Sequence, residues 1–158
     1  MVNTRLDVSP TPARPADFEA VLTLLEEAGL PTADVGQHFE RFFVVHEAGR
    51  VIGAIGVETH GADALLRSLV VAREWRGRGL GRRLLDHVVD AAGSQGVRTI
   101  YLLTTSAAGF FEPRGFERCD RAGVPLAIAR TSEFVSLCPA SAVCMRRELA
   151  DATDVGER

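Results

Sequence analysis

The sequence predicts an α/β (α+β) domain in which a mixed, mostly antiparallel sheet of about six to seven strands is flanked by helices. Short apolar runs between residues 42 and 71 are separated by a few turn residues, which is typical of strands joined by hairpins. Segments with apolar residues three or four positions apart precede and follow this region and predict helices. The dense apolar run 97–103 predicts a central parallel strand that is buried on both faces.

The N-terminal part of the chain predicts a short strand and two helices. Residues 5–8 predict the strand, which the prolines that follow bring to an end. Pro15 suits the first turn of a helix, and Gly29 and Pro31 end that helix. Residues 32–38 predict a second, shorter helix.

Three strands joined by short connections follow, at 42–46, 51–58 and 64–71. Gly53 and Gly56 lie in the second of these strands and mark places where a neighbouring group or a ligand approaches the backbone. The second half alternates between helices and strands, predicted in turn at 79–94, 97–103, 107–114, 116–120, 127–137 and 141–149. We expect residues 5–149 to form one domain and residues 150–158 to form a polar tail.

Residues 73–83, which we call the arginine turn, hold five arginines and three glycines in eleven residues. An apolar strand leads into the turn and an amphipathic helix leads out of it, so backbone N–H groups and a helix N-terminus converge there. Glycines let a ligand approach the backbone, and guanidinium groups bind phosphate. The turn therefore predicts a cradle for the diphosphate of a bound cofactor.

The spacing of the glycines excludes two nucleotide-binding motifs. The dinucleotide fingerprint needs Gly-x-Gly-x-x-Gly, and the P-loop needs a Gly-Lys-Ser/Thr ending; the arginine turn has neither. It does fit the signature (Gln/Arg)-x-x-Gly-x-(Gly/Ala), with Arg76, Gly79 and Gly81 at the defined positions. With this motif between a strand and a helix, the sequence resembles the GNAT superfamily of acyl-coenzyme A N-acyltransferases.

The resemblance implies the GNAT fold, with acetyl-CoA as cosubstrate and no metal. The backbone of the strand before the turn would hold the pantetheine arm of the cosubstrate, and the turn would hold the diphosphate. The predicted cofactor-binding residues are Leu69, Val70, Val71, Arg76, Gly77, Arg78, Gly79, Leu80, Gly81, Arg82, Thr104 and Phe111.

A second segment, residues 104–116, extends the resemblance. Five of its positions agree in register with the family pattern: Ala107, Phe110, Glu112, Gly115 and Phe116. Two positions depart from it, because Thr104 stands where the family often has an asparagine and Phe111 where it often has a tyrosine that protonates the leaving thiolate. A phenyl ring has no proton to give. We therefore expect no tyrosine acid here, and we expect Tyr101 to be structural.

Three further segments resemble a branch of the superfamily found in arsenic-resistance gene clusters: 64–69, 101–105 and 137–145. This narrower resemblance implies a small amine acceptor, such as the arsenic-bearing amino acid arsinothricin or its phosphorus analogue. An anionic head group calls for guanidinium donors, and Arg67 interrupts an otherwise apolar strand. Thr105 is a second candidate for acceptor binding. Cys138 either faces the acceptor or is a small buried hydrophobe.

The resemblance also implies direct acetyl transfer in a ternary complex. The acceptor ammonium must first lose a proton, because only the neutral amine attacks. Glu58 and His60 are the candidate catalytic bases, and a relay through water is an equal alternative. Two other functions stay open: a non-catalytic CoA-binding sensor of the same fold, and a protein N-acetyltransferase.

Composition limits the partners of the protein. A formal net charge of −3 and a pI of about 5.8 argue against a nucleic-acid-binding surface. The sequence has neither an apolar run of the length that spans a membrane nor the apolar core of a signal peptide, so we expect a cytoplasmic protein. Its partner would be a small molecule, and a homodimer is left open. The three cysteines have no Cys-x-x-Cys spacing and suit a reducing compartment better than a disulfide framework.

Overall fold

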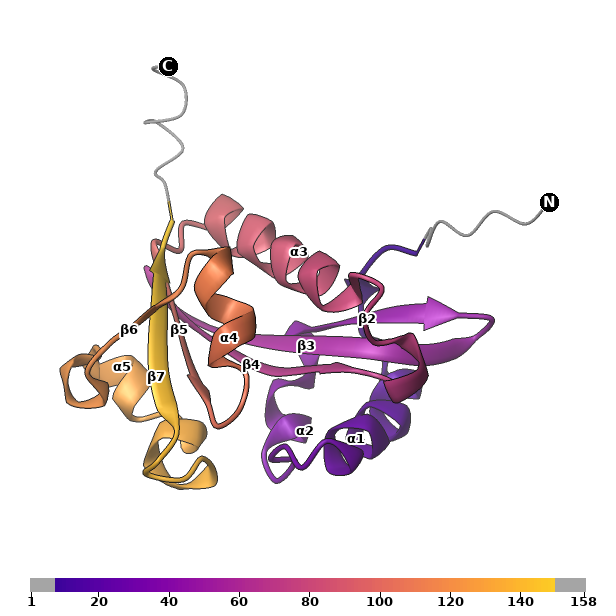
Figure 1. Ribbon diagram of the computed structural model, residues 1–158, viewed down its shortest axis with the longest axis horizontal. Helices are drawn as coiled ribbons and strands as arrows, with labels where there is room; N and C mark the ends of the chain where they lie inside the picture. The colour runs from indigo at the N-terminus through magenta and orange to yellow at the C-terminus, as the bar shows by residue number, and fades with distance from the viewer. Residues whose placement is uncertain (1–7, 150–158) are drawn as a thin grey trace, which may run out of the picture. The chain divides into compact units, whose positions relative to one another are not determined.

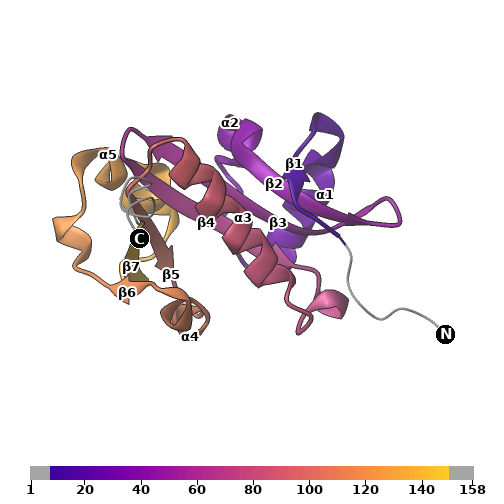
Figure 2. The same cartoon turned by 90° about the horizontal axis from the view of Figure 1, so that it is seen from above.

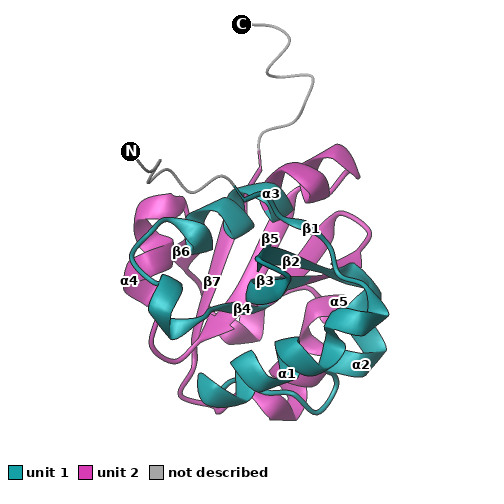
Figure 3. Ribbon diagram, turned by 90° about the vertical axis from the view of Figure 1, so that its right-hand side faces the viewer, with its two compact units in different colours: residues 1–56, 68–88 teal, residues 57–67, 89–158 magenta. Residues whose placement is uncertain are grey.

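The computed structural model describes residues 8–149 and divides into two compact units, which Figure 3 colours separately. Unit 1 contains residues up to 56 together with 68–88, and unit 2 contains 57–67 together with the residues from 89 onward. Most of the predicted first strand, residues 5–7, and the predicted tail, residues 150–158, lie outside the described residues. The organisation as one domain over 5–149 stays a prediction.

The described strands form a seven-stranded sheet in the order β1-β2-β3-β4-β5-β7-β6. Adjacent strands pair antiparallel in β1–β2, β2–β3, β5–β7 and β6–β7, whereas β4 and β5 are parallel. This confirms the predicted mixed, mostly antiparallel sheet. The strands are β1 (Thr11–Pro12), β2 (Phe42–Glu47), β3 (Arg50–His60), β4 (Asp63–Val71), β5 (Thr99–Thr104), β6 (Glu117–Arg118) and β7 (Val143–Glu148).

The helices of the described part occupy the predicted segments with one exception, given below (Figure 1). Between residues 8 and 149 there is no helix both long enough and apolar enough to cross a membrane. The α-helices are α1 (Phe18–Glu27), α2 (Val35–His38), α3 (Leu80–Ser94), α4 (Ala108–Phe111) and α5 (Leu126–Ala129). Short 3-10 turns are η1 (Pro15–Asp17), η2 (Phe39–Arg41), η3 (Arg73–Trp75), η4 (Glu112–Arg114) and η5 (Arg121–Gly123), and η6 (Glu133–Leu137) is a π-helical turn.

Unit 1 is a β-hairpin covered by helices on both faces. Helices α1 and α2 lie on one side of β2 and β3, and the first half of α3 lies on the other (Figures 1 and 2). On the α1 side, Val21 and Leu25 pack in one buried cluster with Phe42 and Val44 of β2. On the α3 side, the ring of Phe43 lies edge-on to His87 at 4.7 Å between centroids. The alternation along β2 therefore buries both faces of the hairpin.

Unit 2 is built around β5, which pairs with strands on both sides. Residues Asp63 to Leu65 of β4 pair in parallel with Thr99 to Tyr101, and all six residues of β5 pair antiparallel with β7. One face of this sheet is covered by an apolar cluster with members from β4, β5, β7, α5 and η6: Leu65, Tyr101, Ile128, Phe134 and Cys144. The prediction of a central buried strand is confirmed for β5, which is parallel to β4 but antiparallel to β7.

The helix predicted over 127–137 is wrong as a single element. Helix α5 ends at Ala129, and a separate π-helical turn begins at Glu133. The break is at Thr131, whose hydroxyl donates to the carbonyl of Ile128 at 2.7 Å, so the side chain bonds to the backbone where the helix would continue. In the π-helical turn the N–H of Cys138 donates to the carbonyl of Glu133 at 3.1 Å, five residues earlier.

Candidate acetyltransferase site

The arginine turn begins where β4 ends and closes where α3 begins, all within unit 1. Gly77 and Gly79 have φ angles of 79° and 86°, which lie in the left-handed region that glycine adopts without strain. A Cβ atom placed on either glycine would meet no heavy atom within 4 Å. The backbone of the turn is therefore open on that side, as close contact with a phosphate group requires.

Two arginines of the turn are oriented by contacts within the turn or with the end of β4. The Nε of Arg76 donates to the carbonyl oxygen of Val71 at 3.0 Å, which ties the side chain to the end of β4. The guanidinium of Arg78 lies over the ring of Trp75 at 4.7 Å from its centroid. The N–H of Arg83 donates to the carbonyl of Gly79 at 3.1 Å and starts the hydrogen bonding of α3. The N–H groups of the first turn of α3 have no acceptor within the helix, which suits an anion.

A cavity of about 430 Å³ lies beside the start of the arginine turn, in unit 1. Val71 lines this cavity and is half-buried, whereas Val70 points into the apolar core. Just before them, Ser68 has a φ of 61°, an unusual left-handed conformation for a strand residue that redirects the backbone of β4. The cavity is lined by Leu24, Glu27, Val71, Ala72, Arg73, Glu74 and Arg76.

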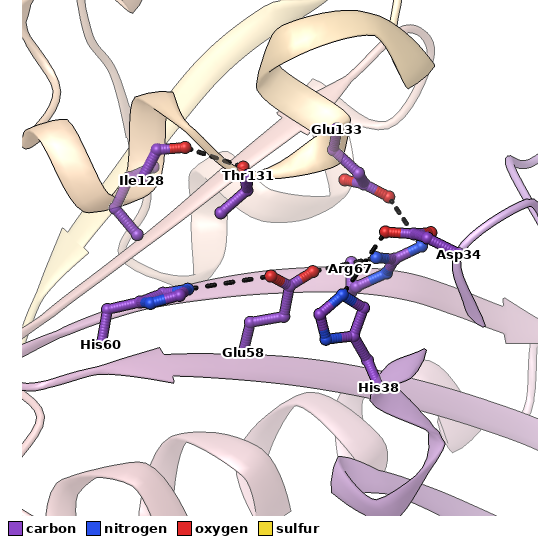
Figure 4. A network of polar contacts seen from close by, with 8 residues as sticks. All are labelled: Asp34, His38, Glu58, His60, Arg67, Ile128, Thr131 and Glu133. Carbon is purple, nitrogen blue, oxygen red and sulfur yellow. Dashed lines mark hydrogen bonds and ion pairs between the residues drawn. The ribbon is translucent and has the colours of Figure 1, made fainter. Parts of the chain in front are cut away.

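Three polar residues predicted on the acceptor side, Glu58, His60 and Arg67, lie in unit 2. Figure 4 shows their side chains together with that of Glu133, which belongs to the same unit. Arg67 donates from Nη1 to Oε2 of Glu58 at 2.9 Å, and its Nη2 lies 3.5 Å from Oε2 of Glu133. The Arg67 side chain is fully buried, and each of the two carboxylate side chains is 5% exposed. His60 is 34% exposed, with Nε2 3.7 Å from Oε1 of Glu58. We call these four residues the Glu58 cluster.

Sequence reasoning missed Glu133, which belongs to η6 and contributes the second carboxylate on Arg67. Its signal in the sequence was an acidic residue among apolar ones, directly before Phe134-Val135 and five positions after Ile128. A carboxylate in such a setting is expected to be paired when it is buried. The partner itself lies 66 positions earlier in the chain and could not be read from local spacing.

Cys138 is half-buried next to Glu133. Burial, and then the charge of Glu133 and a hydrogen bond to it, raise the pKa of the Cys138 thiol to about 12. The thiol is therefore neutral near neutral pH and is neither a nucleophile nor an anionic ligand there. Cys138 is only half-buried and lies against a carboxylate, so it is not a fully buried hydrophobe, and its place facing the acceptor stays a prediction.

Thr104 and Phe111, the two departures from the family pattern, have clear local partners. The Thr104 hydroxyl accepts the N–H of Ala107 at 2.9 Å, just before α4 begins. Phe111 is 5% exposed and makes edge-on contacts with Phe110 and Phe116 at 5.1 and 5.4 Å between centroids. Thr105, in contrast, is exposed in the turn after β5.

Tyr101 is buried in the apolar cluster of unit 2. Burial, and then the nearby charge of Asp63, raise the pKa of its hydroxyl above the ordinary value of 10.0. Tyr101 shares this cluster with Leu65 and Cys144. Its structural role, expected from the sequence, stays a prediction.

The sequence was compared with protein families and with known proteins, and it matches one family. The sequence profile of the acetyltransferase (GNAT) domain matches residues 38–118. An uncharacterized N-acetyltransferase of Chlorobaculum tepidum is 30% identical over 109 residues, which is 68% of either chain. An amino-acid acetyltransferase of Pseudomonas fluorescens is 35% identical over 95 residues, which is 59% of this chain and 22% of that protein.

Solved structures show the same fold. The N-acetylglutamate synthase from Neisseria gonorrhoeae, complexed with coenzyme A and N-acetyl-glutamate, superposes with a TM-score of 0.80 at 22% identity, over 92% of this chain and 36% of that one. This chain thus spans about a third or less of the length of these amino-acid-acetylating relatives. With a family profile that covers half of its residues and includes β4, the arginine turn and α4, the chain belongs to the GNAT acetyltransferase family and is an N-acetyltransferase.

Proposed function

We propose that the protein transfers the acetyl group of acetyl-CoA directly to the amine of a small amino acid. The observation that carries this proposal is the arginine turn, where an open backbone at Gly77 and Gly79 lies beside oriented arginines at the start of α3. The relatives named amino-acid acetyltransferases support the class of acceptor.

In this proposal the arginine turn holds the diphosphate of acetyl-CoA. Arg76 and Arg78 are already oriented by Val71 and Trp75, so less side-chain entropy is lost when they bind phosphate. The backbone of Leu69, Val70 and Val71 pairs with the pantetheine amides as a neighbouring strand would.

The Glu58 cluster recognises the amine end of the acceptor. Arg67 is placed between two carboxylates, so these three side chains together carry one formal negative charge. A net negative site attracts the ammonium form of the acceptor, which must then lose a proton. His60 is the exposed member of the cluster and is the better placed of the two candidate bases to exchange that proton with water. In this arrangement the negative charge of Glu58 stabilises the protonated form of His60.

Among amino acids, we propose arsinothricin and its phosphorus analogue phosphinothricin as the acceptors to examine first. The segments 64–69 and 137–145, which carry the resemblance to the arsenic-resistance branch, contribute Arg67 and Cys138. Pentavalent arsenic does not bind thiols well, so recognition of the acceptor requires no bond between the sulfur of Cys138 and arsenic. Arg67, which the sequence suggested for the anionic head of the acceptor, is fully buried and paired with Glu58 and Glu133. In this proposal the head is therefore bound by other arginines.

The proposal is tested by measuring acceptor-dependent release of CoA thiol together with mass spectrometry of the product. We expect release with one or more amino acids, and a product heavier by one acetyl group. The matching N-acetyl amino acid has no free amine and must give no release. Binding of acetyl-CoA without release across amino acids and amines would contradict the proposal and favour the sensor. Release with peptide N-termini alone would favour a protein N-acetyltransferase.

A further inference from the structure

The thiols of Cys119 and Cys144 lie in direct contact in unit 2. Their sulfur atoms are 3.2 Å apart. Cys119 directly follows β6, and its N–H donates to the carbonyl of Cys144 in β7 at 2.9 Å. The pairing of Arg118 with Met145 places these two cysteines opposite each other across the strands.

The backbone at this pair already suits a disulfide. Directly opposite residues of antiparallel strands have Cα atoms about 4.5–5.5 Å apart, and disulfides join Cα atoms about 4.4–6.8 Å apart. Small rotations of the two side chains would bring the sulfurs from contact to bonding distance without moving the strands. The two thiols also differ in access, since Cys119 is half-buried whereas Cys144 is 4% exposed.

We propose that Cys119 and Cys144 are a redox modification site, at which a hydroperoxide converts the two thiols into a reversible disulfide. Cys119 gives up its proton and its sulfur attacks the peroxide oxygen; the O–O bond breaks, a sulfenic acid forms, and the leaving alkoxide or hydroxide takes up that proton and departs as alcohol or water. The sulfur of Cys144 then attacks the Cys119 sulfur, and the hydroxide that leaves takes the Cys144 proton and departs as water. Two electrons pass from the thiols to the peroxide.

The order of these steps follows from the surroundings of the two sulfurs. Burial, and then the hydrogen bond with Cys119, raise the pKa of Cys144 to about 12, so Cys144 is a poor first nucleophile. Cys119 is the more accessible sulfur and reacts first with the peroxide. Contact with Cys144 then resolves the sulfenic acid before a second peroxide reaches it.

The disulfide would close a loop, residues 120–143, that carries α5 and the π-helical turn. That loop includes Glu133, which lies against the buried Arg67. Cross-linking the base of the loop restricts its unfolded conformations. Oxidation is therefore expected to raise the midpoint of thermal unfolding by roughly 5–10 °C.

The test is oxidation of the whole protein with hydrogen peroxide, followed by alkylation and mass spectrometry. Trypsin releases Cys119 in peptide 119–121 and Cys144 in peptide 131–146, which also holds Cys138. The variant Cys138→Ser therefore identifies the partner of Cys119. We expect wild type and Cys138→Ser to lose the mass of two hydrogens, to show the linked peptides and to recover both thiols with dithiothreitol. After peroxide treatment, Cys119→Ser should retain the free thiols of Cys138 and Cys144, and its unfolding midpoint should be the same as before treatment.

Three outcomes would overturn the proposal. The first is full alkylation of all three thiols after peroxide treatment. The second is a cross-link through Cys138 or between two chains. The third is oxidation of Cys119 to the sulfinic acid with no linked peptide, since this would show that Cys144 does not resolve the intermediate.

Discussion

Arg67 pairs with the two buried carboxylates of the Glu58 cluster in unit 2. Its side chain is fully buried between Glu58 and Glu133, at 2.9 and 3.5 Å. Buried ion pairs lose much of their attraction to the cost of dehydration, yet removal of one partner is strongly destabilising. Arg67 therefore holds two carboxylates in a place where they would otherwise repel each other.

Replacing Arg67 with alanine is expected to lower the free energy of unfolding by about 3 kcal/mol or more. Arg118→Ala is the matched control in the same unit, because Arg118 pairs with Glu112 at 3.1 Å at the surface. That change should cost less than about 1 kcal/mol. Urea unfolding of both variants measures the difference. Equal losses would show that the buried pairs contribute no more than the surface pair.

Asp17 gives a second test at the scale of one side chain, this time through pH. Burial by itself would raise the pKa of Asp17, but the N–H of Arg14 at 2.8 Å and His46 at 2.9 Å outweigh it and lower the pKa below 3.8. The ionised carboxylate thus stabilises the folded state above its ordinary pKa, and this contribution is lost as pH falls through the lowered value.

The stability lost in Asp17→Asn should therefore be largest near neutral pH and should shrink below pH 3.8. Unfolding of wild type and variant, followed at several pH values, measures this difference. A loss that stayed constant from neutral pH down to the acid range would mean that the ionised carboxylate is not the stabilising form.

At the scale of elements, the glycines of β3 are explained by packing within unit 1. A Cβ on Gly56 would lie 2.5 Å from the ring of Phe42, its partner in register on β2. A Cβ on Gly53 would lie 3.1 Å from Leu84 of α3. Of the two possibilities left open by the sequence, a neighbouring group or a ligand, the structure supplies a neighbouring group at both positions.

Gly56→Ala is accordingly expected to cost about 1–3 kcal/mol, because Phe42 is fully packed and cannot yield. Gly109→Ala in α4 is the control, since a Cβ there would meet nothing within 4 Å and alanine favours a helix. That variant should be as stable as wild type or slightly more so. Chemical denaturation that found Gly56→Ala as stable as the control would contradict the close packing of β2 against β3.

At the scale of the whole molecule, the sequence predicts the features that depend on residues close together in the chain, namely turns, helices and single strands. The β2–β3 hairpin follows from two apolar runs separated by a short turn that contains Gly49, which adopts a positive φ without strain. Ala48 also has a positive φ, which alanine does not favour and which the sequence does not predict. Helix α3 follows from its apolar spacing, and the arginine turn from its position between a strand and that helix.

Long-range contacts could not be predicted in the same way. The contact of Arg67 with Glu133 and that of Cys119 with Cys144 depend on strand order and on the path of the 120–143 loop. Apolar spacing at Ile128, Phe134 and Leu137 fits an α-helix and a π-turn alike, so it could not place the break at Thr131. Side-chain chemistry could indicate that Arg67 is functional or paired, but not which carboxylates it meets.

The arginine turn as the coenzyme A diphosphate site is the central claim, and calorimetric titration of CoA tests it most directly. Gly79→Asp adds a negative charge and a side chain at a φ of 86°. Gly61→Asp makes the same change at a φ of 67°, in the β3–β4 turn, where a Cβ also meets nothing within 4 Å. We expect Gly79→Asp to abolish the heat of binding while its circular dichroism matches that of wild type, and Gly61→Asp to bind CoA as wild type does. Unchanged affinity in Gly79→Asp would contradict this assignment.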